Sequence, residues 1–185
     1  KRGTSGKIES IRFARVNKIP FLGICYGMQM AIIEFARNKL KIRNATSSEF
    51  DKKGISIIGL MNEWNKDGIK IKGTDKDLGG TMRLGSYDAK LKENSLVRKI
   101  YKSKIIKERH RHRYEVNISY KEKFEKNGLI FSGLSPDNTL PEIVELKNHP
   151  WFIGVQFHPE FKSRPFNPHP LFTSFIKAAK KRYAK

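Results

Sequence analysis

A predicted strand runs into a predicted helix at Phe21-Leu22-Gly23-Ile24-Cys25-Tyr26-Gly27-Met28-Gln29, with the only cysteine of the chain at the junction. Residues 19–24 are apolar and of strand length, and apolar residues then recur at helical spacing through Phe35. Small residues on both sides of a nucleophile let the chain turn sharply and hold the reactive atom clear of the backbone. Buried core thiols are common, but the flanking glycines favour a nucleophile at Cys25. The N–H groups that open the helix are expected to favour its thiolate form.

This order of elements predicts an α/β fold with a central, mostly parallel sheet flanked by helices. An amphipathic helix is expected over residues 5–18 and another from Tyr26 to about Arg37. A closing helix is expected over 171–183, with Phe172, Phe175, Ile176 and Ala179 on its buried face. Further strands are expected at 55–60, 129–134, 142–146 and 152–157, and the glycine-rich stretch 67–85 is expected to be a loop.

The composition fits one domain over residues 1–185, because the chain is too short for two large cores. Lys and Arg number 38 against 18 Asp and Glu, a formal net charge of +20. The basic residues are spread along the whole chain, which favours a solvated surface over a nucleic-acid partner. A lone cysteine excludes an internal disulfide, and no stretch is long enough to span a membrane. We therefore expect a cytoplasmic protein without a membrane partner.

A second motif, Gln156-Phe157-His158-Pro159-Glu160-Phe161, offers a partner for the cysteine. In an extended segment residues two apart share a face, so the His158 and Glu160 side chains are expected to meet. Pro159 disfavours the helical conformation at His158. A carboxylate that orients and charges an imidazole would stabilise a thiolate–imidazolium pair with Cys25. The two motifs together predict a Cys25, His158 and Glu160 catalytic triad.

Gly-Ile-Cys-Tyr-Gly-Met-Gln at 23–29 and Gln-Phe-His-Pro-Glu-Phe at 156–161 resemble the triad-type class I glutamine amidotransferases. Four further segments, at 46–50, 77–85, 108–117 and 148–152, are similar to the C-terminal glutaminase domain of the CTP synthase family. The resemblance covers essentially the whole chain. It implies a flavodoxin-like class I glutaminase fold.

The resemblance also implies a role for each matching residue. Cys25 would attack the carboxamide of L-glutamine, His158 would transfer the protons, and Glu160 would orient His158. A zwitterionic substrate needs one anionic and one cationic partner, here Glu49 for the α-amino group and Arg113 for the α-carboxylate. The rest of the glutamine pocket is expected to comprise Tyr26, Gly27, Met28 and Gln29.

The family's architecture implies partners outside this chain. Ammonia would pass to an N-terminal synthetase domain of the same polypeptide, which uses ATP and Mg²⁺ to convert UTP to CTP in a homotetramer. No metal or cofactor is expected in residues 1–185, while the segment 72–81 resembles a lid associated with activation by GTP. The first sheet strand and a Gly-Gly-Phe-Gly-type oxyanion loop are expected upstream of Lys1, so the chain alone is expected to be a poor glutaminase.

Some alternatives remain open at this point. In an extended conformation the run 109–113 would put three arginines on one face, and His110 and His112 on the other, where they could hold a metal. The arginines could instead contact nucleic acid, although the glutamine pocket is the favoured place for Arg113. The whole chain could also be a class I glutaminase that serves GMP or anthranilate synthesis, or a catalytically silent basic binding module.

Overall fold

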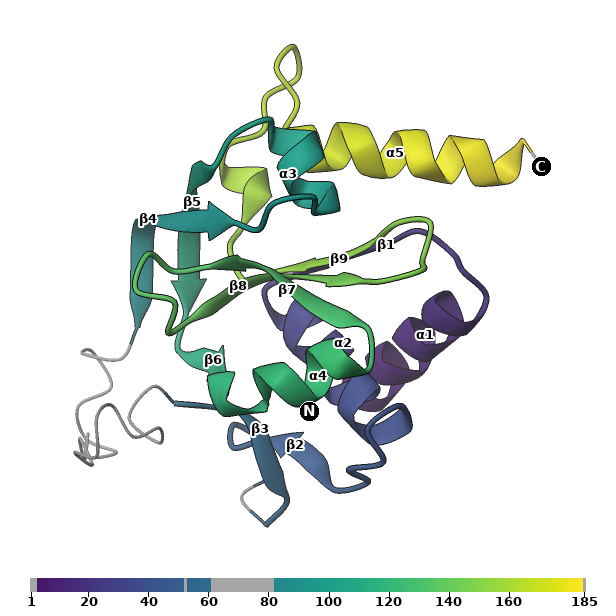
Figure 1. Ribbon diagram of the computed structural model, residues 1–185, viewed down its shortest axis with the longest axis vertical. Coiled ribbons are helices and arrows are strands. Elements are labelled where there is room, and N and C mark those ends of the chain that lie inside the picture. The colour runs from purple at the N-terminus through teal and green to yellow at the C-terminus, as the bar shows by residue number, and fades with distance from the viewer. Residues whose placement is uncertain (1–2, 52, 61–81, 185) are drawn as a thin grey trace.

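A six-stranded sheet lies at the centre of the structure, a computed structural model that describes residues 3–51, 53–60 and 82–184 (Figure 1). The helices are α1 (Thr4–Val16), α2 (Tyr26–Asn38), α3 (Leu96–Tyr101), α4 (Lys121–Lys126) and α5 (Pro170–Tyr183), with 3₁₀ turns η2 (Ile118–Tyr120) and η3 (Pro159–Phe161). The strands are β1 (Phe21–Ile24), β2 (Ala45–Ser47), β3 (Ile55–Leu60), β4 (Arg83–Leu91), β5 (Ile105–His112), β6 (Tyr114–Val116), β7 (Leu129–Leu134), β8 (Pro141–Leu146) and β9 (Phe152–Val155).

The strand order of the larger sheet is β1-β9-β8-β7-β4-β5, and a smaller sheet has the order β2-β3-β6. The expectation of a mostly parallel sheet is wrong for the described residues. In the larger sheet only β1 and β9 pair in parallel, and every other neighbouring pair is antiparallel. The cause is the length of the connections: segments such as 147–151 are too short for the crossover that parallel neighbours require.

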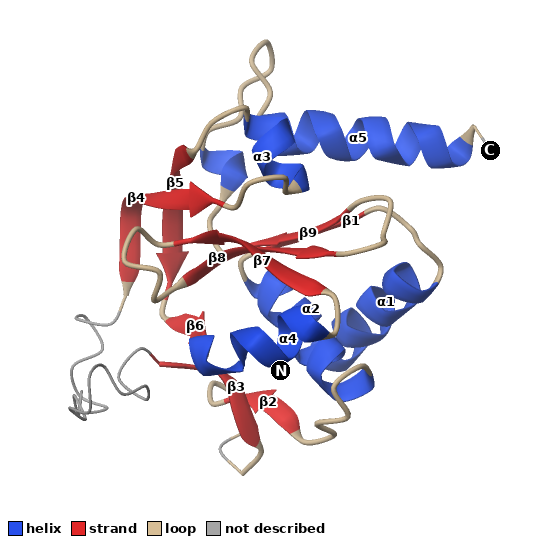
Figure 2. Ribbon diagram, in the orientation of Figure 1, coloured by secondary structure: helices blue, strands red, loops and turns tan. Residues whose placement is uncertain are grey.

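Helices cover both faces of the larger sheet, as expected (Figure 2). α1 and α2 lie on one face and α3 and α5 on the other. Successive strand residues supply the two cores in turn, since Val144 faces α2 while Ile143 packs on the opposite side. Cys25 lies between the end of β1 and the start of α2. It therefore follows a strand of a sheet that is packed on both faces.

Two expectations about local structure need correction. The loop expected over 67–85 lies outside the described residues through position 81, but Arg83 to Gly85 belong to β4, where they pair with β5. The buried side predicted for α5 is confirmed in part: Phe175 packs against the core beside the fully buried Leu171, whereas Ile176 is 56% exposed. The helix packs against α3, and its Phe175 ring contacts Trp151, directly before β9, with ring centroids 5.3 Å apart.

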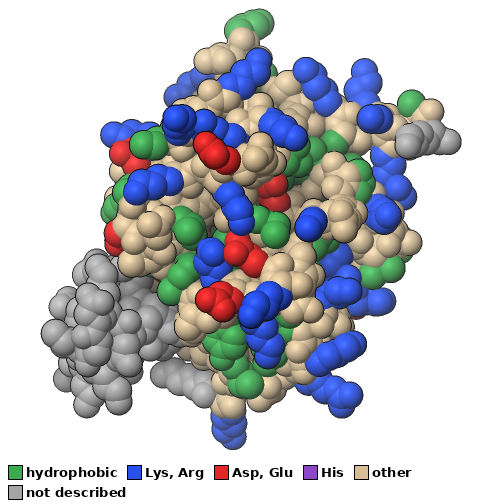
Figure 3. All heavy atoms as spheres, in the orientation of Figure 1, with side chains coloured by type: hydrophobic (Ala, Val, Ile, Leu, Met, Phe, Trp, Pro, Cys, Tyr) green, Lys and Arg blue, Asp and Glu red, His purple; other side chains and the backbone are tan. Residues whose placement is uncertain are grey.

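Basic side chains are scattered over the face of the molecule shown in Figure 3 rather than gathered into one patch, with a few Asp and Glu among them. None of the described helices is long and apolar enough to cross a membrane.

Candidate active site

Cys25 occupies a sharp turn between β1 and α2. Its backbone has φ 49° and ψ −103°, a combination that is strained for any residue with a side chain. The Cys25 N–H donates to the Val155 carbonyl at 2.7 Å, which fastens the turn to the end of β9. The predicted elbow is confirmed, with the side chain held at the strand-to-helix corner and half-buried.

The two glycines that flank the cysteine have different roles in this turn. A Cβ at Gly23 would lie 2.8 Å from the Gly27 carbonyl carbon and 2.9 Å from the Met28 nitrogen, so the first turn of α2 can approach only a glycine there. A Cβ at Gly27 would meet nothing within 4 Å. The fold therefore requires glycine at position 23, whereas the surroundings of Gly27 leave room for a Cβ atom.

His158 and Glu160 form a close pair just beyond β9. The His158 Nδ1 and Glu160 Oε1 atoms are 2.6 Å apart. The segment is not extended as expected: His158 precedes the 3₁₀ turn η3, and the turn, with Pro159 at its start, brings the two side chains together. The pairing predicted from their spacing is thus present, although by a different backbone geometry. The His158 Nε2 atom is buried and has no hydrogen-bond partner among the described residues.

The segment that carries this pair is anchored to β5. The His158 N–H donates to the Arg109 carbonyl at 2.8 Å, and the Lys162 Nζ donates to the Lys107 carbonyl at 2.6 Å. Farther along, His169 Nε2 lies 3.0 Å from the buried carboxylate of Glu108. These contacts fix the segment that carries His158 against β5, directly after β9, the parallel neighbour of the strand that Cys25 follows.

The protonation state of the thiol differs from the sequence-based expectation. Burial raises the pKa of Cys25 to about 11, and the negative charges of Glu115 and Glu160 act in the same direction. The Tyr26 backbone N–H and the Gln156 amide lower the pKa, but by less than burial raises it. The helix N-terminus is thus present as predicted, yet the thiol retains its proton at neutral pH.

A cavity of about 250 Å³ opens beside the cysteine. Both charged residues predicted to hold a zwitterion, Glu49 and Arg113, line it, and no described residue forms an ion pair with the Arg113 guanidinium. Met28 is fully buried in the core, and neither Met28 nor Gly27 is part of the cavity wall. The complete lining consists of Cys25, Tyr26, Gln29, Glu49, Met82, Arg111, His112, Arg113 and Tyr114.

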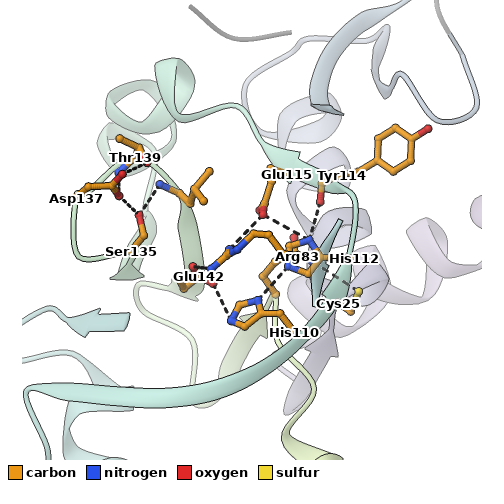
Figure 4. Close-up of polar contacts among 12 residues, drawn as sticks. Cys25, Arg83, His110, His112, Tyr114, Glu115, Ser135, Asp137, Thr139 and Glu142 are labelled. Atoms are coloured by element: carbon orange, nitrogen blue, oxygen red, sulfur yellow. Dashed lines mark hydrogen bonds and ion pairs between the residues drawn. The ribbon is translucent and has the colours of Figure 1, made fainter. Parts of the chain in front are cut away.

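A buried ionic network lies directly behind the cavity (Figure 4). Arg83 is 3.2 Å from Glu115 and 2.8 Å from Glu142, and the two carboxylates also approach His112 and His110 at 3.5 Å. As the alternation in 109–113 predicts, both histidines point inward, where they contact each other at 3.0 Å. The described residues include no group of three or more His, Cys, Asp or Glu placed to hold a metal.

Burial sets the charge state of this network. It lowers the pKa of His110 to about 2 and that of His112 to about 3, assisted by the positive charge of Arg83. It also raises the pKa of Glu115 to about 8, against the attraction of Arg83. At neutral pH both histidines are therefore uncharged. Sequence reasoning missed Arg83, Glu115 and Glu142 as neighbours of the site, and no local pattern signals contacts between residues so far apart in the chain.

Comparisons with known proteins identify the family of the chain. The family model described as glutamine amidotransferase class-I matches residues 1–178. The chain belongs to the class-I glutamine amidotransferase family. The expectation of a class I glutaminase fold is confirmed, apart from the strand directions corrected above.

Within that family the chain is similar to CTP synthases. It is 84% identical over 180 residues to the CTP synthase of Pelagibacter ubique and 58% identical over 180 residues to that of Rhodospirillum rubrum. These matches cover 97% of this chain and 34% and 33% of the two relatives, so the chain spans about a third of their length. Among solved structures it resembles the glutaminase domain of Trypanosoma brucei CTPS with bound acivicin, at 39% identity and a TM-score of 0.86, covering 98% of this chain and 67% of that one.

Proposed function

We propose that this chain hydrolyses L-glutamine to glutamate and ammonia, with Cys25 as nucleophile, His158 as general acid and base, and Glu160 as the residue that orients His158. The proposal rests on one observation. The strained turn at Cys25 directly follows β1, and the His158–Glu160 pair follows β9, which is the parallel neighbour of β1. The Glu160 carboxylate contacts the Nδ1 atom of His158, and the buried Nε2 atom is left to exchange a proton.

The chemistry begins from a protonated thiol, because burial keeps the pKa of Cys25 high. His158 Nε2 takes the thiol proton as the sulfur attacks the carboxamide carbon of glutamine. The same nitrogen then gives the proton to the departing amine, the C–N bond breaks, and ammonia leaves a glutamyl thioester on Cys25. His158 next deprotonates a water molecule, which cleaves the thioester to glutamate and restores the thiol. Glu160 stabilises the imidazolium in both halves of the reaction.

The cavity supplies the charges that a free amino acid requires. Glu49 would bind the α-amino group and Arg113, through its planar guanidinium, the α-carboxylate, while the carboxamide points toward Cys25. Tyr26 and Gln29 form the adjoining wall. Gly27 and Met28, which the sequence placed in the pocket, are not part of the cavity wall, and the Met28 side chain lies in the core.

The similarity to CTP synthases supports a place for this reaction in a longer enzyme. The ammonia would pass to an N-terminal synthetase domain of the same polypeptide, which would use ATP and Mg²⁺ to activate UTP for amination to CTP. GTP would activate glutamine hydrolysis, and the full enzyme would be a cytoplasmic homotetramer. The high identity to CTP synthases supports this assignment over a glutaminase of GMP or anthranilate synthesis.

The test compares two sources of nitrogen in the full-length enzyme. Cys25→Ala should abolish CTP formation from glutamine and the release of glutamate, while CTP formation from free ammonia continues near the wild-type rate, because ammonia bypasses the triad. The ammonia reaction also serves as the control for folding. Glutamate release that survives the substitution would overturn the proposal.

A further inference from the structure

Gln156 is a fully buried side chain one residue beyond β9, and the triad does not use it. Its backbone N–H donates to the Glu142 carbonyl at 2.8 Å, which continues the sheet pairing past the end of the strand. Its side-chain Nε2 lies 3.6 Å from the Cys25 sulfur, within hydrogen-bond reach of a thiol or thiolate.

The orientation of this amide follows from its neighbours. Gln29 Nε2 donates to the Tyr114 carbonyl at 2.9 Å and to Gln156 Oε1 at 3.1 Å. A backbone carbonyl only accepts hydrogen bonds, so the Tyr114 oxygen requires the NH₂ end of Gln29 on its side. That NH₂ group in turn requires an oxygen from Gln156, because two NH₂ groups facing each other would leave a buried donor unpaired. The Gln156 NH₂ group is therefore left facing Cys25.

We propose that Gln156 is a positioning residue that donates an amide hydrogen bond to the Cys25 sulfur, with its direction fixed by Gln29 and the Tyr114 carbonyl. This inference rests on the proposed function, in which Cys25 is the nucleophile. The N–H donor fixes the thiol toward the cavity and stabilises the negative charge that develops on sulfur as His158 takes the proton. It also connects the sulfur to two residues of the cavity wall, Gln29 and Tyr114.

Two substitutions at Gln156 separate the hydrogen bond from packing. Gln156→Met keeps the length of the side chain but has no donor. Gln156→Glu keeps an oxygen for Gln29, and places a carboxylate oxygen where the amide faced the sulfur. Val155→Ala is the matched control, because Val155 is also fully buried, is adjacent in β9, and makes no side-chain bond to Cys25.

The measurement is the rate of Cys25 alkylation by iodoacetamide as a function of pH, without glutamine. Gln156→Met should raise the thiol pKa by about one unit, so that alkylation below that pKa slows about tenfold, and Gln156→Glu should raise it further. Val155→Ala should leave the profile near that of the wild type. Glutamine turnover in the full-length enzyme should fall in the same order, with a smaller change in KM than in kcat.

Profiles of both Gln156 variants that coincide with the wild type, or with the Val155→Ala control, would overturn the inference. Because alkylation is measured without substrate, this failure is distinguishable from a failure of the glutaminase assignment, which the Cys25→Ala assay tests. Unfolding curves of the three variants identify any rate change that comes from loss of structure.

Discussion

Replacing Gly23 by alanine should damage both the fold and the chemistry, whereas the same change at Gly27 should not destabilise the fold. The new Cβ at position 23 would lie 2.8–2.9 Å from three backbone atoms of Gly27 and Met28, where ordinary contacts begin at 3.4 Å. Backbone atoms cannot rotate away as a flexible side chain can, so β1 and the start of α2 would have to separate. Insertions of this kind into packed regions cost about 1–3 kcal/mol.

The assay pairs thermal unfolding of the Gly23→Ala and Gly27→Ala variants with the glutamine turnover of the full-length enzyme that carries the same substitutions. Each kcal/mol corresponds to about 2–4 °C in Tm for a chain of this size. Gly27→Ala should be at least as stable as the wild type, because alanine in a helix is favoured over glycine by up to about 1 kcal/mol. Gly23→Ala should also lower kcat, since a displacement of about 1 Å in reacting groups can cost about a hundredfold. A Gly23→Ala variant with wild-type Tm and kcat would refute the reasoning about the elbow.

In the full-length enzyme, Glu160→Gln should lower kcat for glutamine less than His158→Ala, because Glu160 acts only through the imidazole; equal losses would contradict that role. Arg113→Ala should raise the glutamine KM at least tenfold, since truncating one partner of a charge pair costs about 2–5 kcal/mol, and a KM within twofold of wild type would dismiss Arg113 as a ligand. His112 has a folded pKa of about 3 against 6.5, so its contribution to stability is present above pH 6.5 and is lost as the pH falls toward 3. The wild type should therefore lose about 1.4 kcal/mol more per pH unit than His112→Gln in urea unfolding across this window, and parallel pH profiles would show that His112 does not resist protonation.

The elbow and the helices around it were predictable from sequence, because the signals are local. Glycines around Cys25 and the apolar period of 26–37 specify a strand, a turn and a helix within a few residues. Met28 illustrates a conflict between two signals. Its place in the apolar period indicated the core, its place in the motif indicated the pocket, and the side chain is in the core.

Features that depend on distant residues could not be read from the sequence. Arg83 was expected in a loop, yet it starts β4 and pairs with Glu142, a contact that exists only because β4 and β8 belong to one sheet. The thiol was expected to be ionised because a helix begins beside it, but its pKa depends on how much water the surrounding chain excludes. Gln156 carried no distinguishing sequence signal beyond its place two residues before His158.

A covalent label offers the sharpest test of the proposed catalysis. The full-length enzyme is treated with a diazoketone analogue of glutamine, with and without excess L-glutamine, and then analysed by peptide mass spectrometry. The account predicts a single adduct, on Cys25, whose formation is slowed by glutamine and parallels the loss of glutamate release. Inactivation with the label on any other residue would contradict the assignment of Cys25 as the nucleophile.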